Sequence, residues 1–502
     1  MSLLTKIACI VFADRLRSIE RMRTDAALMQ QKVLHSLLTT AQKTQFAQSH
    51  GLSADSTYED FRQRVPVSDY EHFAPYVEQM VRGEANVTWP GQIRWFAKSS
   101  GTTDAKSKFI PVTTESLHTA QYRGSLDALV TYAKQHPESA IYKGKCLTLG
   151  GSKQISTINN RAQTGDLSAI MIGNAPTWSN FFKTPQKDVA LLANWEEKLP
   201  QIMKATVGEN VSYLAGVPSW MLVLLHYILE HTGKSNIQEV WPNLELFIHG
   251  GINFEPYRSQ YEQIAPRGLN FIETYNASEG FFALQTDPDD RSMQLMMDYG
   301  IFYEFVPLDE VGQEFPAGAT PIEGVSTGVD YALVITANNG LWRYMIGDTV
   351  RFTDTRPHKI RISGRTKLYI NAFGEELMIG NAEVAIRQAC EQTGAVVREY
   401  TAAPIFMDKN SHGRHEWLIE FERQPTDVNL FSSILDGALQ EVNSDYEAKR
   451  HNNTTLAPLK LTIARDGLFY DYMRQNGRLG GQNKVPRLKN DRSLIDQLLA
   501  LN

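Results

Sequence analysis

Short apolar runs alternate with helical segments between residues 145 and 280, and this alternation limits the chain to few folds. KCLTLGG (145–151), LELFIHGG (244–251) and NFIETYNASEG (270–280) read as buried strands that end in glycine or polar residues. VSYLAGVPSWMLVLLHYILEHTG (211–233) reads as a strand, a turn and an apolar helix, and a further helical segment covers 186–205. Strands that alternate with helices predict an α/β domain of layered, mostly parallel sheets.

The sequence pattern changes at residue 294, from alternating strands and helices to mostly strands. MQLMMDYGIFYEFVPL, YALVITANNGLWRYMIGDTVRF and KIRISGR are strand-rich and are joined by Gly, Asn, Asp and Pro. They predict an antiparallel sheet or a small barrel-like subdomain attached to the main sheets. A tail with its own α/β alternation follows, and Gly364 and Gly374 bracket the link to it. We therefore expect a large N-terminal domain over 1–370 and a smaller α+β domain over 371–502.

The N-terminal part of the chain is predicted to be helical. Helix-forming residues fill 15–48, and 57–83 and 115–136 also have helical spacing. The apolar run from Ile7 to Ala13 is too short for a signal peptide or a membrane span. We expect this run to begin a helix that packs on the body of the protein.

The composition excludes several classes of function. The chain has 502 residues, of which 42% are hydrophobic and 21% charged, which is typical of a globular protein. A net charge of −6 argues against a nucleic-acid scaffold, which needs a basic face. Cys9, Cys146 and Cys390 are too few and too scattered for a disulfide framework or a zinc site. These features favour a cytoplasmic location.

The segment FAKSSGTTDAKSKFIPVT (96–113) concentrates groups that bind anions. Five small residues stand together there: Ser99, Ser100, Gly101, Thr102 and Thr103. They can turn tightly and offer backbone N–H groups and hydroxyls to one anion, and Lys106 and Lys108 add positive charge beside it. We expect the bound anion to be a polyphosphate. Taken alone, the segment is also compatible with an ordinary polar loop. The Walker pattern is absent, so a P-loop NTPase is not supported.

Further polar motifs follow predicted strands, where α/β sheets bind their ligands. YNASEG (275–280) supplies Tyr275, Ser278 and Glu279, and WRYMIGD (342–348) ends in Asp348. The pattern G-x-S-x-G would need glycine at position 276, so Ser278 is not a nucleophile elbow. Glycines 250 and 251 end another strand, where a ligand can approach the backbone closely. Taken singly, each motif is also compatible with a surface turn.

Taken in order, the motifs resemble those of one family. SSGTTxxxSKFIPVT, with FRQRVPVSDYEHFAPYVEQMVRGE, YNASEGFFAL, YEFVPL, GLWRYMIGDTVRF and the late NKVPR, is similar to the Gretchen Hagen family of acyl acid amido synthetases, within the acyl-adenylate-forming enzymes. The resemblance covers nearly the whole chain and implies a bacterial-type member. It also implies a C-terminal domain that rotates about the link near Arg365.

The resemblance implies a site for ATP and Mg²⁺. Residues 99–103 would hold the phosphates with Lys108, and Tyr275 would stack on or flank adenine near Gly251. Ser278 would donate to phosphate, and Glu279 would help to hold Mg²⁺, since a carboxylate beside polyphosphate needs a cation between them.

The other half of the implied site lies further along the chain. The resemblance assigns Asp348 to the ribose hydroxyls and Arg365 to ribose or phosphate. Lys484, in GGQNKVPR, matches the lysine that swings onto the α-phosphate during adenylation. The chain departs from the family pattern at Trp342 and Met345, and has Lys367 where many adenylating enzymes place an Asp. Met345 puts a phosphate or acyl contact from that position in doubt, and Lys367 puts the hinge chemistry in doubt.

The family resemblance implies a ligase. The enzyme would adenylate a small carboxylic acid, release pyrophosphate, and pass the acyl group to the amine of an amino acid with release of AMP. An acyl-coenzyme A ligase and a catalytically silent nucleotide sensor are the alternatives. We expect a monomer that binds neither nucleic acid nor a membrane. The acid and the amine cannot be named from the sequence.

Overall fold

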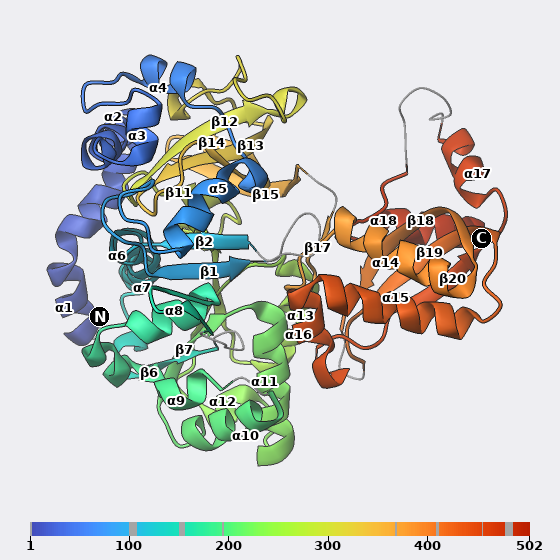
Figure 1. Ribbon diagram of the computed structural model, residues 1–502. Helices are drawn as coiled ribbons and strands as arrows, with labels where there is room; N and C mark the ends of the chain where they lie inside the picture. The colour runs from blue at the N-terminus through green and yellow to red at the C-terminus, as the bar shows by residue number, and fades with distance from the viewer. Residues whose placement is uncertain are drawn as a thin grey trace.

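The computed structural model describes residues 3–99, 108–149, 156–192, 195–366, 369–407, 411–453, 455–476 and 485–502. A large N-terminal part is built on one broad sheet, and a smaller C-terminal part lies beside it (Figure 1). The expected mixed α/β class, with a large N-terminal sheet domain and a smaller C-terminal domain, is confirmed. The domain boundary at residue 370 stays a prediction.

The main sheet has eleven strands in a single hydrogen-bonded series. In spatial order they are β12 (Ile301–Pro307), β13 (Asp330–Ala337), β14 (Tyr344–Thr355), β15 (His358–Arg365), β11 (Met293–Leu295), β10 (Gly280–Leu284), β9 (Asn270–Ala277), β8 (Leu246–Gly250), β7 (Val211–Gly216), β3 (Lys145–Thr148) and β6 (Lys183–Thr184). Pairing is parallel from β9 to β6 and antiparallel from β9 to β12.

Beyond β9 the main sheet continues in antiparallel pairing, so of the two expected forms the described part of the chain shows the antiparallel sheet attached to the main one and not the separate barrel. The physical reason is the connection after β9. Ser278 and Glu279 form a two-residue turn, because Ala277 pairs directly with Gly280. The chain returns at once as β10, so the antiparallel strands continue the same sheet instead of starting a new one.

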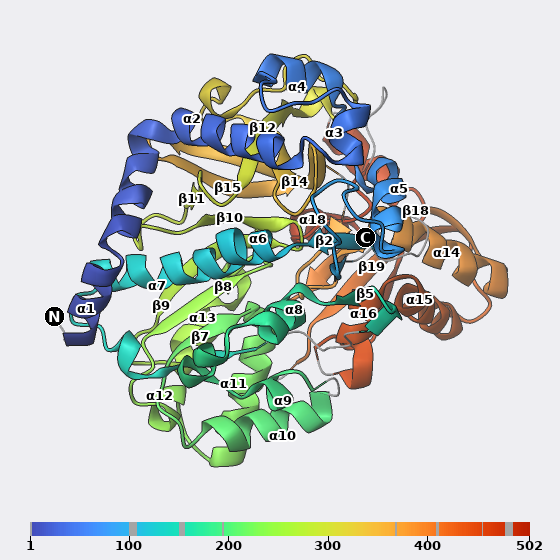
Figure 2. The same cartoon turned by 60° about the vertical axis from the view of Figure 1, so that its left-hand side comes forward.

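Helices cover both faces of this sheet. On one face lie α10 (Trp195–Thr206), α11 (Pro218–Thr232) and α13 (Glu255–Ile264), whose apolar side chains share a core with β7 and β8. The other face carries α2 (Ala13–Ala41) and the continuous helical segment α6 (Thr114–Ser116), η1 (Leu117–Tyr122) and α7 (Arg123–Gln135) (Figure 2). The predicted helices over 15–48 and 115–136 are confirmed.

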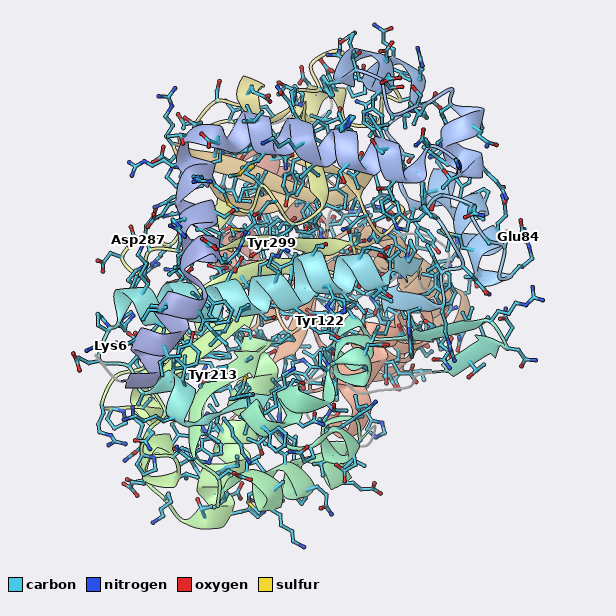
Figure 3. The ribbon with its side chains drawn as sticks, turned by 90° about the vertical axis from the view of Figure 1, so that its left-hand side faces the viewer. Lys6, Glu84, Tyr122, Tyr213, Asp287 and Tyr299 are labelled. Atoms are coloured by element: carbon cyan, nitrogen blue, oxygen red, sulfur yellow. The ribbon has the colours of Figure 1, made fainter. Side chains whose placement is uncertain are left out.

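An ion pair joins the helices α2 and α7. Arg15 of α2 forms an ion pair with Asp127 of α7 at 2.7 Å, and Tyr299 donates a hydrogen bond to the same carboxylate, also at 2.7 Å. Figure 3 shows Tyr299 between α2 and α7. The apolar helix α1 (Leu3–Val11) precedes them and packs on α7, as expected. No helix in the described part of the chain combines the length and apolar character of a membrane span.

Both described ends of the predicted anion-binding segment lie in a small second sheet. Its strands, in spatial order, are β2 (Lys108–Val112), β1 (Trp95–Ser99), β5 (Ala162–Gly165) and β4 (Ser156–Asn159). The two ends of the segment over 96–113 are therefore antiparallel strands, where the sequence pattern had suggested a loop. Ser99 pairs with Lys108 across them, so both ends of the predicted phosphate loop are held in a regular ladder.

The C-terminal part has a three-stranded sheet of β18 (Val396–Ile405), β19 (Arg414–Arg423) and β20 (Lys460–Ala464). The helices α14 (Ile379–Thr393), α15 (Val428–Val442), α16 (Ser444–Arg450), α17 (Leu468–Gln475) and α18 (Ser493–Leu501) accompany it. This part packs on α11 and α13: Tyr257 donates to the Ala372 carbonyl at 2.6 Å and Gln260 donates to the Met407 carbonyl at 2.9 Å.

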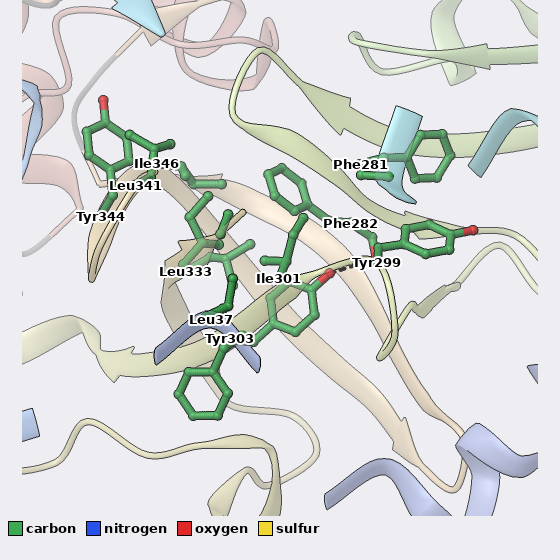
Figure 4. Packing of buried hydrophobic residues seen from close by; sticks show 14 of the residues in the cluster. Leu37, Phe281, Phe282, Tyr299, Ile301, Tyr303, Leu333, Leu341, Tyr344 and Ile346 are labelled. Atoms are coloured by element: carbon green, nitrogen blue, oxygen red, sulfur yellow. Dashed lines mark hydrogen bonds between the residues drawn. The ribbon is translucent and has the colours of Figure 1, made fainter. Parts of the chain in front are cut away.

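Aromatic side chains fill the core between the antiparallel strands and their helices (Figure 4). Phe281 faces α7 at Gly124, where a Cβ atom would lie 2.6 Å from the Phe281 ring. On the other side of the hairpin, Phe282 lies beside Tyr303, whose hydroxyl donates to the Phe282 carbonyl at 3.4 Å. This close packing fixes the position of β10, and with it the turn that precedes β10.

One ion pair lies inside this core. Arg343 forms two hydrogen bonds to the Glu304 carboxylate at 2.9 Å each, and both side chains are only 1% exposed. The Tyr58 hydroxyl donates to the same carboxylate at 3.0 Å. The remaining guanidinium nitrogen of Arg343, Nη1, donates to the Val65 carbonyl at 2.7 Å. The charge and hydrogen-bonding groups of Arg343 are therefore used within the core, although the residue belongs to the motif that ends at Asp348.

We predict that Glu304→Gln destabilises the protein by about 3 to 5 kcal/mol, because it leaves the Arg343 charge buried without its counterion. Urea unfolding followed by circular dichroism measures the effect. Asp330→Asn is the matched control, since it breaks the ion pair with Arg351 on the neighbouring strand, where the guanidinium is half exposed. The control is expected to change the urea concentration at the unfolding midpoint only slightly. Equal losses of stability from the two substitutions would contradict the prediction.

Candidate active site

The polar motifs meet at one edge of the main sheet. The parallel strands β8 and β9 end there at Gly250 and Ala277, and Asp348 on β14 pairs in register with Arg365 on β15. Three segments that lie far apart in the sequence are thus brought together at the carboxyl ends of the parallel strands, where α/β sheets bind ligands.

Asp348 is the centre of this arrangement. Its Oδ2 accepts a hydrogen bond from the Tyr275 hydroxyl at 2.7 Å, and its Oδ1 lies 2.7 Å from Nε of Arg365. Both contacts fix the carboxylate, which is only 8% exposed. Each oxygen has a second lone pair, so the carboxylate can still accept hydrogen bonds from a ligand.

Arg365 connects Asp348 to the C-terminal part of the chain. Its guanidinium lies 3.9 Å from Glu376 and 4.9 Å from the centre of the Tyr369 ring. Burial disfavours the charged guanidinium, but the nearby negative groups, Asp348 and Glu376 foremost, outweigh it and raise the pKa of Arg365. The arginine therefore stays charged and bridges acidic groups on both sides of the predicted hinge.

Glu279 occupies the turn between β9 and β10 and is almost completely buried. Burial raises the pKa of its carboxyl to about 7, although the nearby positive charge of Lys108 acts in the opposite direction. Lys108 begins β2, and its ammonium group lies 5.8 Å from the centre of the Tyr70 ring. The structure thus brings Lys108 close to Glu279, as the shared-site prediction requires.

The backbone is unusually close at the end of β8. A Cβ atom at Gly250 would lie 2.4 Å from the Thr274 carbonyl oxygen, so only glycine fits. Gly251 has φ +85°, a conformation that other residues rarely adopt, and its carbonyl accepts a hydrogen bond from the Asn371 side chain at 3.2 Å. These glycines let the end of β8 lie close against β9.

Several predicted residues cannot be placed. Ser100, Gly101, Thr102, Thr103, Lys367 and Lys484 lie outside the described residues, and for Ser99 only the backbone is described. Ser278 lies in the turn beside Glu279 and is half-buried. Tyr275 is 4% exposed and packs on Phe282, so the described structure shows it supporting Asp348. The assigned ligand contacts of all these residues stay predictions.

Sequence reasoning missed two residues of this site. Glu376, which follows the predicted hinge, pairs with Arg365 and has a positive φ of +39°. Gln121 lies in the π-helical turn η1 and donates to the Ala277 carbonyl at 3.3 Å, directly before the Ser278–Glu279 turn. The acidic pair after Gly374 was a signal for Glu376, whereas nothing in the helical pattern pointed to Gln121.

The residues present fit a nucleotide with its cation only in part. Among the residues that the structure describes, no group of three His, Cys, Asp or Glu side chains could hold a metal ion alone. A cation at Glu279 would therefore need further oxygens from a bound ligand, as Mg²⁺ bound to polyphosphate has.

The fold and this site define a two-part α/β protein with a charged ligand site at the carboxyl edge of its parallel strands. Three family models match the chain: the GH3 family N-terminal domain over residues 15–270, the GH3 family central domain over 294–365 and the GH3 family C-terminal domain over 380–493. The chain belongs to the GH3 family, and the family resemblance of its motifs is confirmed.

Curated relatives match over nearly their whole length. The Oryza sativa subsp. japonica protein named jasmonoyl–L-amino acid synthetase GH3.5 is 24% identical, over 97% of this chain and 97% of its own. The Arabidopsis thaliana protein named indole-3-acetic acid-amido synthetase GH3.3 is 23% identical, over 94% of this chain and 91% of its own.

Solved structures share the fold. The AtGH3.15 acyl acid amido synthetase in complex with 2,4-DB superposes with a TM-score of 0.62 at 18% identity, over 97% of this chain and 95% of that one. A 2-hydroxyisobutyryl-CoA ligase in complex with 2-HIB-AMP and CoA gives a TM-score of 0.57 at 14% identity, over 97% and 93% of the two chains.

We predict that Glu279→Gln stabilises the ligand-free protein at pH 8 but not at pH 5. The folded protein keeps a proton on Glu279 up to about pH 7, whereas the unfolded chain loses it near the ordinary value of 4.5. The stability of the parent therefore falls as pH rises between these values, by about 3 kcal/mol, and glutamine avoids this loss. Thermal unfolding at both pH values measures it.

Glu262→Gln, at an exposed position of α13, is the control and is expected to shift neither melting temperature. A stabilisation by Glu279→Gln that is the same at pH 5 and pH 8 would show that the proton on Glu279 is not its cause.

Proposed function

We propose that this chain is an ATP-dependent acyl acid amido synthetase. The observation that carries the proposal is the Tyr275–Asp348–Arg365 arrangement beside Glu279 and Lys108, in a chain that belongs to the GH3 family from residue 15 to residue 493. The rice relative is named a jasmonoyl–L-amino acid synthetase and the Arabidopsis relative an indole-3-acetic acid-amido synthetase, and these names support the same reaction class here. We expect a monomeric cytoplasmic enzyme.

The site is suited to holding a nucleotide by its sugar. We assign the free lone pairs of Asp348 to the ribose hydroxyls, because Tyr275 and Arg365 already hold the carboxylate in one orientation. Gly251 offers an open backbone edge near adenine. The strand ends at Ser99 and Lys108 fix a loop for the phosphates between them. The contacts of Ser100, Gly101, Thr102, Thr103 and Ser278 with phosphate belong to this proposal.

Glu279 is assigned to Mg²⁺ because a buried carboxylate with a raised pKa gains most from a nearby cation. A bound Mg²⁺ would neutralise charge on the phosphate oxygens, and Lys108 adds a second positive charge from the protein. Lys484 is assigned to the α-phosphate during adenylation, after a rotation of the C-terminal domain. Arg487, close to Lys484 in the sequence, is the alternative for this role, and in the described structure it forms an ion pair with Glu383 at 2.7 Å.

The reaction needs no covalent nucleophile of the protein. The carboxylate of the acid attacks the α-phosphorus of ATP, and pyrophosphate leaves as an acyl-adenylate forms. An amine then attacks the acyl carbon, AMP leaves, and the amide remains. Catalysis of both steps depends on positioning and on charge neutralisation at the phosphate, which the assigned residues would supply.

Pyrophosphate release tests the proposal. ATP and Mg²⁺ would be supplied with a panel of aromatic, aliphatic and hydroxy acids, with and without mixed amino acids. Acid-dependent release of pyrophosphate, with AMP formation that rises when one amino acid is added, is the expected result. Thioester formation with coenzyme A in place of amide would support the acyl-CoA ligase instead. ATP binding without release by any acid would support a nucleotide sensor.

We predict that Asp348→Asn lowers kcat/KM for ATP by roughly 10- to 150-fold, the effect of losing a hydrogen bond to a charged group. Asp354→Asn, at an exposed position of the same strand, is the control and is expected to leave kcat/KM unchanged. The comparison is made with a saturating acid that the panel identifies. Equal kinetics of the two variants would remove Asp348 from the nucleotide site.

A further inference from the structure

Two buried amide side chains hold the turn that carries Ser278 and Glu279. Gln121 of η1 donates from Nε2 to the Ala277 carbonyl at 3.3 Å, directly before the turn. At the last residue of the turn, the Glu279 carbonyl accepts a hydrogen bond from Nδ2 of Asn339 at 2.9 Å. Gln121 and Asn339 are only 3% and 2% exposed. Side chains from two other segments therefore fix the backbone of the turn, in addition to its own strand pairing.

The same two segments are also joined to each other. Asn338, next to Asn339 in the connection from β13 to β14, donates from its side chain to the Thr119 hydroxyl of η1 at 2.7 Å. The Asn338 carbonyl accepts a hydrogen bond from the Thr113 hydroxyl at 2.8 Å. Hydrogen bonds thus link the helical segment, the Ser278–Glu279 turn and the connection at Asn338 into a closed set. A displacement of any one segment would break contacts to both of the others.

Close packing leaves this set little freedom. Phe281, two residues after Glu279, lies against Gly124 of the same helical segment, where a Cβ atom would come within 2.6 Å of the ring. A Cβ atom at Gly300 would lie 2.3 Å from Nδ2 of Asn338. Figure 2 shows α7, the continuation of this helical segment, running along β10, and the two elements are in contact. Packing and hydrogen bonds therefore hold the turn together.

The helical segment connects the turn to the strand of Lys108. β2 ends at Val112, and the next residue, Thr113, is the N-cap of α6, where its side chain accepts a hydrogen bond from the Ser116 backbone at 3.0 Å. The hydrogen bonds of the helical segment therefore relate the strand that carries Lys108 to the turn that carries Glu279. These are two charged residues of the candidate active site that lie close together.

Gln121 has a feature that a residue serving only to fill the core does not need. Its Oε1 is buried and, within the part of the chain that the structure describes, has no hydrogen-bond partner. Burying an amide oxygen in this way destabilises a folded protein, whereas an apolar side chain of similar size, such as methionine, would fill the same space without this effect. What glutamine adds at this position is the donor to the Ala277 carbonyl.

We propose that Gln121 and Asn339 are positioning residues that keep the Glu279 carboxylate in place for the Mg²⁺ of a bound nucleotide. This inference rests on the proposed function, which assigns Glu279 to that cation. Neither amide needs to contact the nucleotide, because each acts through a backbone carbonyl of the turn or of the residue before it. A carboxylate on a fixed turn binds a cation with a smaller loss of conformational entropy than a carboxylate on a mobile turn.

Calorimetric titration of ATP, in the presence of Mg²⁺ and with EDTA in its place, tests this role without turnover. Gln121→Met is expected to lower the affinity for ATP with Mg²⁺ by roughly three- to tenfold, the effect of losing one hydrogen bond, and to change the affinity for metal-free ATP by less than about twofold. The substitution also removes the buried amide oxygen, so the melting temperature is expected to stay close to that of the parent.

Gln238→Met is the matched control. Gln238 lies on α12 (Ile237–Val240), is 4% exposed and donates to the Gly268 carbonyl at 2.9 Å. Its Oε1 accepts a hydrogen bond from the Arg267 backbone at 2.9 Å, so both ends of this amide have partners. Gln238→Met is therefore expected to lower the melting temperature and to leave the affinity for ATP with Mg²⁺ unchanged, the reverse of the pattern expected for Gln121→Met.

Kinetics supply a second measurement. With an acid that the panel identifies, Gln121→Met is expected to raise the Mg²⁺ concentration for half-maximal pyrophosphate release by roughly three- to tenfold, and to recover most of the parental kcat at saturating Mg²⁺. Asn339→Ala is expected to act in the same direction. It also removes the acceptor for the Leu341 backbone at 3.2 Å, so Gln121→Met is the more specific of the two substitutions.

The binding measurement separates this inference from the proposed function. If no acid releases pyrophosphate, the proposed function fails, yet binding of ATP with Mg²⁺ that Gln121→Met weakens and Gln238→Met does not would still support the positioning role. If Gln121→Met weakens ATP binding equally with and without Mg²⁺, or binds ATP as the parent does, the positioning role is overturned while the proposed function stands. Binding of ATP to the parent that does not respond to Mg²⁺ would overturn it as well.

Discussion

The two-residue turn of Ser278 and Glu279 is the constraint on which both the sheet and the site depend. It reverses the chain after β9 within two residues, so the antiparallel strands join the parallel ones in a single sheet. Continuous pairing then places Asp348 of β14 and Arg365 of β15 at the same edge as the end of β8. A longer connection would permit a separate barrel, and the register between Tyr275 and Asp348 would no longer follow from the sheet.

The turn also places a carboxylate where solvation is poor. Burying an unpaired charge destabilises a folded protein, and two features of the structure reduce this effect for Glu279. Glu279 keeps a proton more readily, with a pKa of about 7, and Lys108 supplies positive charge nearby. Asp348 is treated differently, since Tyr275 and Arg365 contact it directly. The charge of Asp348 is thus compensated by direct contacts within the protein, whereas that of Glu279 is compensated only weakly, and for this reason the proposed cation is assigned to Glu279.

The sequence predicted the class of fold and most helices, because these depend on local patterns. Of the predicted site residues, the described structure brings Tyr275, Asp348 and Arg365 into contact. Strand and helix periods, glycines at strand ends and polar residues after strands are all visible along the chain. The continuity of the sheet was not predicted, since it depends on whether a turn has two residues or more. Arg343 was indistinguishable from a ligand contact in its motif, and only its burial beside Glu304 shows its structural position.

Tyr275, Asp348 and Arg365 stand on three strands of one sheet, so the geometry of their contacts follows from the sheet itself. Arg365 also lies 3.9 Å from Glu376, which follows the predicted hinge. If the C-terminal part rotates as the family resemblance implies, the contact between Arg365 and Glu376 is the one that changes, whereas the contacts of Asp348 within the sheet stay as they are. The sheet can therefore hold one ligand in place through both steps of a reaction while the C-terminal part changes position between them.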